Sequence, residues 1–151
     1  MADVVVIGAG NAALCAALSA AEQGASVTVL ERAPKEQRGG NSAFSGGAFR
    51  VTYDGVEDLK RLIPDLSETE IANTDFGTYT EETYFNDLAR LSEYHMDPDL
   101  AEILTTQSLE VAEWMSNRGV RFVPIYGRQA YKVDGRFKFW GGLTIEASGG
   151  G

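Results

Sequence analysis

The sequence predicts an α/β fold in which a parallel β-sheet opens the chain and a mainly helical segment and a β-hairpin follow. Two short apolar runs, residues 3–7 and 27–30, flank an alanine-rich stretch of helix-forming residues. Farther along, a helical pattern begins at Asp97-Pro98, and Asp134-Gly135 separates two alternating stretches. A strand, a helix and a second strand within about 30 residues make one βαβ unit, whose two strands are parallel.

The two first runs lack the alternation of a half-exposed strand. Uninterrupted β-branched residues are typical of parallel strands that are covered on both faces. The stretch between them is rich in helix formers as far as Gly24, which we expect to cap the helix. Cys15 lies in this stretch and is predicted to be a small core residue. Residues 34–56 are predicted to be a loop.

Residues 51–119 are predicted to be mainly helical. A short helix over 56–63 is stopped by Pro64. A second helix begins at the capping Thr80 and runs to residue 94. The third has Asp97 as its N-cap and Pro98 at its first helical position, and Gly119 ends it.

Residues 120–151 are predicted to hold a strand over 120–123, a hairpin and a closing glycine turn. Asp134-Gly135 suits a type I′ turn, which needs positive φ at both central positions. The two predicted parallel strands are too few to cover the helices. We therefore expect the N-terminal portion of a longer protein, divided into residues 1–50, 51–119 and 120–151, with a capping domain and a C-terminal half absent.

The charge of the chain is strongly acidic but uneven. The formal net charge is −9, from 22 acidic and 13 basic residues, which argues against a general nucleic-acid binder. Between Arg118 and Lys138 there are six basic residues and one acidic residue, so that this segment is +5 and the remainder is −14. The segment is either a solvated basic face or an attraction for an anionic substrate or for cofactor phosphates.

Several site classes are disfavoured by what the chain contains. A single cysteine excludes an intrachain disulfide and a multi-cysteine zinc site. The single histidine, His95, follows a predicted helix, where a surface or capping role is expected, and we predict no metal site and no Ser-His-Asp triad. Neither a signal peptide nor a transmembrane segment is visible, so a cytoplasmic location is expected.

The turn after the first strand carries a dinucleotide-binding pattern. Gly8 permits a tight turn, Gly10 lets the backbone approach a pyrophosphate, and Ala13 is small enough for the helix to pack on the strand. The helix N-terminus, with Asn11 and Ala12, directs its free N–H groups at the phosphates. Glu31 ends the next strand, where it can accept hydrogen bonds from the ribose hydroxyls and repel a 2′-phosphate. This is the start of a Rossmann-type domain, but the pattern does not separate FAD from NAD.

A second glycine-rich stretch, "RGGNSAFSGGAFR", follows the second strand. Together with "DVVVIGAGNAALCAALSAAEQGASVTVLER" it resembles the succinate dehydrogenase and fumarate reductase flavoprotein superfamily. That superfamily includes 3-ketosteroid Δ1-dehydrogenases and tricarballylate dehydrogenases, and "GNAALCAAL" and "RGGNS" are most similar to the latter. The closing "ASGGG" resembles the family's later glycine turn, which returns the chain to the FAD domain. The helical middle matches by layout rather than by motif.

The resemblance implies a glutathione-reductase-like FAD-binding domain. It places Gly39, Gly40, Asn41 and Ser42 beside the pyrophosphate and flavin, where bare backbone allows close approach and a hydroxyl can donate to a phosphate. Gly46 and Gly47 leave room for a flat ring. The full predicted cofactor-binding set is Gly8, Gly10, Asn11, Ala12, Ala13, Glu31, Arg32, Arg38, Gly39, Gly40, Asn41, Ser42, Gly46 and Gly47. Covalent family members have a histidine where Asn41 stands, so the FAD is expected to be non-covalent.

The implied activity is that of an FAD-dependent oxidoreductase. Hydride would pass between a substrate carbon and flavin N5 at a carbon–carbon bond of an anionic polycarboxylate such as tricarballylate, fumarate or succinate, with a possible electron-transfer partner. A 3-ketosteroid Δ1-dehydrogenase-like enzyme is the alternative. In relatives the catalytic residues lie in the capping domain and the C-terminal part, so none is assigned here and the fragment is expected to be inactive. A non-catalytic module that binds NAD or ADP-ribose is a third hypothesis.

Overall fold

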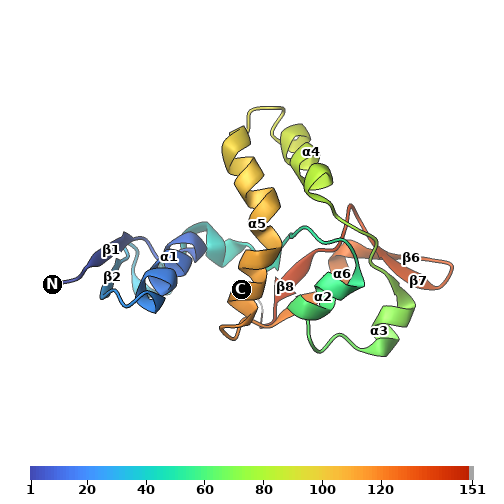
Figure 1. Ribbon diagram of the computed structural model, residues 1–151, viewed down its shortest axis with the longest axis horizontal. Coiled ribbons are helices and arrows are strands. Elements are labelled where there is room, and N and C mark those ends of the chain that lie inside the picture. Colours follow the sequence, from blue (N-terminus) through green and yellow to red (C-terminus); the bar gives the residue numbers. More distant parts are fainter. Residues whose placement is uncertain (150–151) are drawn as a thin grey trace. The chain divides into compact units, whose positions relative to one another are not determined.

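The computed structural model describes residues 1–149, which form two compact units (Figure 1). The first unit contains Met1–Gly47 and Gly149, and the second contains Ala48–Ser148. The helical segment and the hairpin, predicted as separate stretches, therefore belong to one unit. Gly150 and Gly151, which complete the predicted glycine turn, lie outside the described residues.

The first unit is built around the predicted βαβ arrangement. Strand β1 (Val4–Ile7) leads into helix α1 (Asn11–Glu22), and strand β2 (Val27–Leu30) follows. The two strands are parallel, with Val4 opposite Val27. The α/β class and the parallel pairing are thus confirmed.

Helix α1 ends at the predicted glycine. Gly24 has a φ of 87°, and its N–H donates to the carbonyl oxygen of Ala21 over 3.0 Å. The N–H of Ala25 reaches the carbonyl oxygen of Ala20 over 3.2 Å. These two bonds form a Schellman motif, which satisfies the last carbonyl groups of the helix and turns the chain toward β2.

The stretch predicted as a loop after β2 is partly helical, so that prediction is wrong in detail. It contains two short 3-10 helices, Lys35–Gln37 and Gly40–Phe44, and the two-residue strand β3 (Ala48–Phe49). The second of these helices starts at Gly39, whose φ of 102° is in the left-handed region. Such short helices have no strong sequence pattern, because their i→i+3 bonds form in segments of only three to five residues.

The strands of the first unit were predicted to be covered on both faces, but in this chain they are not. Val5 is 55% exposed, Ile7 is 85% exposed and Leu30 is 53% exposed. Cys15 is half-buried rather than part of a core. The physical reason is that two strands and one helix offer too little surface to enclose each other.

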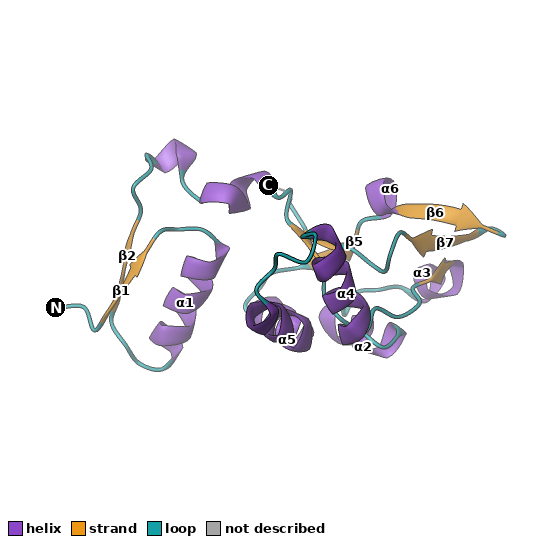
Figure 2. Ribbon diagram, turned by 90° about the horizontal axis from the view of Figure 1, so that it is seen from above, coloured by secondary structure: helices purple, strands orange, loops and turns teal. Residues whose placement is uncertain are grey.

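The second unit contains five helices and six strands among its described residues (Figures 1 and 2). The helices are α2 (Val56–Leu62), α3 (Glu68–Asn73), α4 (Glu81–Leu91), α5 (Pro98–Ser116) and α6 (Tyr126–Gln129). The strands are β3, β4 (Thr74–Asp75), β5 (Phe122–Pro124), β6 (Ala130–Val133), β7 (Arg136–Phe139) and β8 (Ile145–Ala147). Nowhere in residues 1–149 does a helix combine the length and apolarity needed to cross a membrane.

Helices α4 and α5 lie side by side, and both begin at the predicted caps (Figure 1). The side chain of Thr80 accepts the N–H of Thr83 over 3.2 Å at the start of α4. The Asp97 carboxylate accepts the N–H of Asp99 over 3.0 Å, with Pro98 at the first position of α5. Both caps are confirmed, because a side-chain oxygen there satisfies an amide that has no partner within the helix.

Helix α3 was not predicted, although its start carries a recognisable signal. Ser67 and Glu70 form a capping box: the serine hydroxyl accepts the N–H of Glu70, and the glutamate accepts the N–H of Ser67. The spacing of a serine and a glutamate three residues apart is the usual signature of such a start. The short, six-residue length of the helix leaves too few positions for an apolar period.

Two small sheets complete the second unit. In the first, the order is β3-β8-β5 with antiparallel pairing, and β8 lies where only a glycine turn was predicted. In the second, the order is β4-β7-β6. The predicted hairpin is confirmed there, because Asp134 and Gly135 have φ values of 50° and 83° between β6 and β7. The strand predicted over 120–123 is β5, one to two residues later.

The apolar core of the described chain lies entirely in the second unit. Aromatic pairs contribute to this core: Phe76 stacks on Phe139 at 6.0 Å between ring centroids, and Phe49 meets Phe122 edge-on at 5.4 Å. The largest fully buried side chains are Tyr79, Phe122, Leu59, Leu62, Leu143 and Ile145.

Tyr53 joins three parts of this core through its hydroxyl group. The side chain is 2% exposed, and its oxygen donates to the carbonyl of Phe76 over 2.7 Å and accepts the N–H of Leu143 over 2.8 Å. Replacing Tyr53 by phenylalanine is expected to lower the free energy of unfolding by about 2 kcal/mol, because both backbone groups lose their partner in a buried place. Denaturant unfolding measures this change. Tyr131→Phe, on the half-buried face of the hairpin, is the control, and an equal effect of the two variants would contradict the assigned role.

Candidate functional site

The predicted cofactor-binding residues all lie in the first unit, on three stretches that follow one another in the chain. These are the turn between β1 and α1, the end of β2, and the loop that carries the 3-10 helix Gly40–Phe44. The carboxyl ends of parallel strands meet at one edge of a sheet, which is where dinucleotides bind in such folds. The three stretches are therefore suited to form one site.

The turn after β1 is held by the end of β2. Gly8 has a φ of 104°, and its N–H donates to the carbonyl oxygen of Leu30 over 2.6 Å. The next amide, that of Ala9, donates to Oε2 of Glu31 over 2.9 Å. A Cβ built on Gly8 would meet no atom within 4 Å, so the outer side of the turn is open to a ligand.

Glu31 uses both carboxylate oxygens within the protein. Its Oε1 accepts the N–H of Ala33 over 2.8 Å, while Oε2 accepts that of Ala9. The hydrogen bond from the Ala33 N–H is the largest effect on the pKa of Glu31 and lowers it. Burial is the next largest and raises the pKa, and the bond from Ala9 lowers it again, so that the pKa lies below its usual value. The side chain is therefore anionic at neutral pH, and each oxygen keeps a lone pair for a ribose hydroxyl.

Gly10 lies where the third stretch meets the turn. An added Cβ would be 3.3 Å from the carbonyl oxygen of Gly39 and 3.4 Å from Oγ of Ser42. The following amide, that of Asn11, donates to the same Oγ over 3.0 Å. A small residue was predicted here for the approach of a pyrophosphate, and the structure adds a second reason, which is the approach of the protein's own loop.

The glycines of the loop present bare backbone. Gly39 and Gly40 have φ values of 102° and 54°, and a Cβ on Gly40 would meet nothing within 4 Å. Gly46 and Gly47, with φ values of 62° and 69°, end the first unit's loop. The side chain of Asn41 is exposed between these pairs. The N–H groups at the start of α1, the Ser42 hydroxyl and the open glycine backbone fit an adenine dinucleotide that carries a flavin ring.

The remaining predicted residues lie along the same stretches of chain. Arg32 and Arg38 are exposed in the loop, and Ala12 and Ala13 lie in the first turn of α1. The bonds that join Ala9 to Glu31 and Asn11 to Ser42 were not predicted from the sequence. The first of these follows from the shared edge of two parallel strands, whereas no pattern in the sequence indicates the second.

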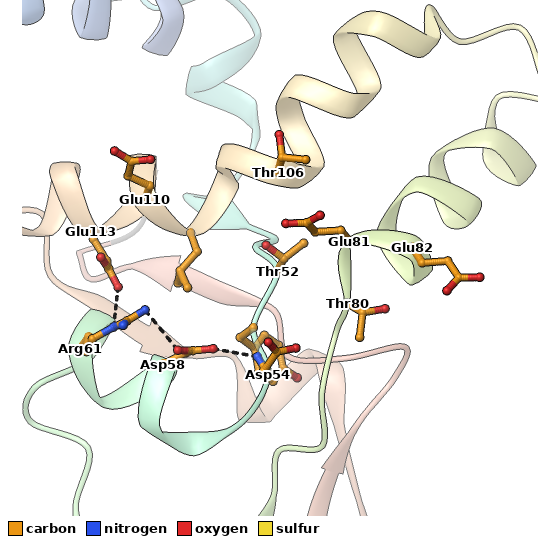
Figure 3. A pocket seen from close by; sticks show the side chains of 12 residues that line it. Thr52, Asp54, Asp58, Arg61, Thr80, Glu81, Glu82, Thr106, Glu110 and Glu113 are labelled. Atoms are coloured by element: carbon orange, nitrogen blue, oxygen red, sulfur yellow. Dashed lines mark hydrogen bonds and ion pairs between the residues drawn. The ribbon is translucent and has the colours of Figure 1, made fainter.

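One pocket of the second unit does not suit a carboxylate substrate (Figure 3). This cavity of about 500 Å³ is lined by one basic residue, Arg61, and by six acidic residues: Asp54, Asp58, Glu81, Glu82, Glu110 and Glu113. Arg61 is already paired with Asp58 at 3.1 Å and with Glu113 at 2.9 Å. The uncompensated negative charge would repel an anion.

The basic segment 118–138 is used for contacts inside the second unit. Three of its cations form ion pairs, Arg121 with Asp65, Arg128 with Glu146 at 3.3 Å, and Lys138 with Asp75 at 3.0 Å. The other three donate to backbone carbonyls or lie over aromatic rings: Arg118 over Trp114, Arg136 to Thr74, and Lys132 over Phe137. The segment therefore gives no independent support for an anionic substrate.

The described residues contain no cluster of three or more His, Cys, Asp or Glu side chains that could hold a metal ion. His95 is exposed after α4, with Nδ1 3.2 Å from the carbonyl oxygen of Ser92. This position agrees with the predicted surface or capping role.

Comparison with known proteins gives one consistent result. The family described as "FAD binding domain" matches residues 3–144. The chain is 28% identical over 145 residues to the fumarate reductase (cytochrome) of Shewanella frigidimarina, which covers 96% of this chain and 22% of that protein. It is 32% identical over 151 residues to the 3-oxo-5-alpha-steroid 4-dehydrogenase of Comamonas testosteroni, covering 95% and 24% respectively.

A solved structure supports the fold. The 3-ketosteroid delta1-dehydrogenase of Sterolibacterium denitrificans, in complex with 1,4-androstadiene-3,17-dione, has a TM-score of 0.61 to this chain at 20% identity. The match covers 95% of this chain and 22% of that one. The chain thus spans between a fifth and a quarter of the length of these relatives.

Proposed function

Since this chain belongs to the FAD-binding domain family, we propose that it is part of an FAD-dependent oxidoreductase of the fumarate reductase and succinate dehydrogenase type. The observation that carries the proposal is the convergence of two glycine turns and one carboxylate in the first unit. When bound, FAD supplies a hydride donor or acceptor at N5 of its ring.

The residues of this chain would bind and orient the cofactor. The first turn of α1 offers backbone N–H groups to the pyrophosphate, and Ser42 offers a hydroxyl hydrogen. Glu31 accepts hydrogen bonds from the ribose and repels a 2′-phosphate. The bare backbone at Gly39 and Gly40, with that at Gly46 and Gly47, leaves space for the ring. Arg32, Arg38 and Asn41 border this surface.

Binding of FAD to the complete protein tests the proposal directly. We expect the protein purified without added cofactor to carry FAD or to take it up from solution, as measured by its visible absorption and by mass spectrometry of the released ligand. Recovery of NAD or ADP-ribose in place of FAD would instead support a non-catalytic dinucleotide-binding module. Failure to bind any of the three would refute both.

The bond to FAD is proposed to be non-covalent. By the family resemblance, Asn41 stands where covalent members have histidine, and an amide side chain cannot form the same bond to the flavin. Acid or heat denaturation is therefore expected to release all of the flavin into the supernatant, because only non-covalent contacts hold it. Yellow, fluorescent protein that persists on a denaturing gel would contradict this prediction.

For the substrate, we favour a polycarboxylate such as tricarballylate, fumarate or succinate. The support is the similarity over nearly the whole chain to a protein named fumarate reductase (cytochrome), which also motivates an electron-transfer partner. The acidic pocket of the second unit is not the place for such a substrate. We propose that the residues that bind the carboxylates and transfer the proton lie outside these 151 residues. A cytoplasmic location is also part of the proposal.

A 3-ketosteroid is the second candidate substrate, because a steroid dehydrogenase is also similar over most of the chain. The two candidates differ in which compound changes the flavin spectrum of the complete protein. A polycarboxylate substrate would be supported if tricarballylate or succinate bleaches the oxidised flavin under anaerobic conditions. It would also be supported if fumarate, added to the reduced protein, restores the spectrum of the oxidised flavin. The same responses to a 3-ketosteroid pair alone would support the second.

A further inference from the structure

The backbone amides around the turn after β1 are not equivalent. Those of Gly8, Ala9 and Asn11 are bound inside the protein, at 2.6, 2.9 and 3.0 Å from their acceptors. Within residues 1–149, the amides of Ala12 and Ala13 have no protein acceptor, as is usual for the first turn of a helix. The protein therefore separates amides that hold the turn in shape from amides that remain for a ligand.

Ser42 supplies one of the three acceptors and is the one that comes from the distant loop. Its Oγ accepts the N–H of Asn11, a residue 31 positions earlier in the chain. Its own N–H donates to the carbonyl oxygen of Gly39 over 3.2 Å. Ser42 is thus fixed at its backbone by its own turn and at its side chain by α1.

The bond also determines how the hydroxyl group can act. A serine hydroxyl has one hydrogen and two lone pairs. Because a lone pair takes the hydrogen of Asn11, the hydroxyl hydrogen of Ser42 must be directed to another acceptor. Gly10 favours this close approach, since an added Cβ would lie 3.3 Å from the carbonyl oxygen of Gly39 and 3.4 Å from the Ser42 oxygen.

We propose that Ser42 is a positioning residue that ties the 3-10 helix Gly40–Phe44 to the first turn of α1 before the cofactor binds. This inference rests on the proposed FAD site and adds that the loop is pre-formed by the protein itself. Pre-formation lowers the ordering cost of binding, so losing the bond weakens affinity even where the contact surface is unchanged.

The test compares variants of the complete protein in the apo state and during FAD titration. Ser42→Ala removes the acceptor of the Asn11 N–H. Ser42→Cys replaces it with a sulfur atom, which is a weak acceptor, at similar side-chain volume. Ser42→Thr keeps a hydroxyl group. Ser45→Ala is the matched control, because Ser45 sits in the same loop but bonds only to Ser42 and Gly47 within it. Circular dichroism establishes that each variant is folded.

We expect hydrogen exchange at the Asn11 amide of the apo protein to be about 5- to 10-fold faster in the Ala and Cys variants. Their dissociation constants for FAD should rise about 10-fold or more. Threonine should restore both quantities, and Ser45→Ala should match the wild type in both. Apo exchange is the decisive readout, because a serine that only touches bound phosphate would leave it unchanged.

The two proposals can fail separately. A wild-type protein that does not bind FAD would refute the proposed function, whatever the exchange rates show. A wild-type protein that binds FAD, with unchanged apo exchange at Asn11 in both the Ala and the Cys variants, would refute the positioning role of Ser42 alone. Failure of threonine to restore either quantity would likewise count against a role of the hydroxyl group.

Discussion

Replacing Gly142 by alanine is expected to lower the free energy of unfolding of the second unit by about 3–5 kcal/mol. Gly142 has a φ of 93°, which L-residues rarely adopt, and an added Cβ would lie 2.7 Å from Cδ2 of Tyr79. The Tyr79 ring cannot easily move away, because it is 1% exposed and its hydroxyl donates to Asp87 over 2.9 Å. Strain of the backbone and overpacking of the core therefore add.

Gly119→Ala is a closely matched control for this prediction. Gly119 belongs to the same unit and has a φ of 94°, but a Cβ on it would meet nothing within 4 Å. The control should cost only the backbone strain, about 1–2 kcal/mol. Denaturant unfolding, followed by the fluorescence of Trp114 and Trp140, gives both values. Equal losses for the two variants would show that the contact with Tyr79 does not limit residue 142.

Replacing Glu31 by glutamine is expected to weaken FAD binding by the complete protein about 30- to 100-fold. The amide nitrogen of glutamine cannot accept a hydrogen bond, so either Ala9 or Ala33 loses its acceptor. If Ala9 is the amide left without an acceptor, the turn after β1 loses one of its anchors. In either case the ribose loses a charged acceptor. Isothermal titration with FAD measures the change.

Glu36→Gln is the control for the loss of charge, because Glu36 is an exposed acid in the same unit, within the 3-10 helix Lys35–Gln37. It should bind FAD like the wild type, and an equal loss in the two variants would point to net charge rather than to the bonds of Glu31.

The pH dependence of FAD binding gives a further check on Glu31. The pKa of Glu31 is lowered in the folded protein, so the carboxylate is fully ionised above the ordinary value near 4.5. Its contribution to FAD binding is lost only as pH falls through the lowered pKa. Glu31 should therefore cause no loss of affinity between pH 8 and pH 5.

Elements with strong local signals could be predicted from the sequence. The caps at Thr80 and Asp97, the glycine end of α1 and the Asp134-Gly135 turn are all confirmed, because each depends on residues within a few positions of one another. Helix α3 and strand β8 were missed, since a six-residue helix and a three-residue strand are too short for an apolar pattern to repeat.

The site, too, combines features that depend on neighbouring residues with contacts between residues far apart in the chain. Spacing alone determined that a glycine turn, a helix start and an acid after the next strand occur together, and that a second glycine stretch follows. Only the tertiary structure decided that Glu31 binds the Ala9 amide, that Ser42 binds the Asn11 amide, and that the cations of segment 118–138 are engaged within their own unit. Those bonds join residues some 20 to 60 positions apart, and their partners are chosen by chain packing, which leaves no periodic trace in the sequence.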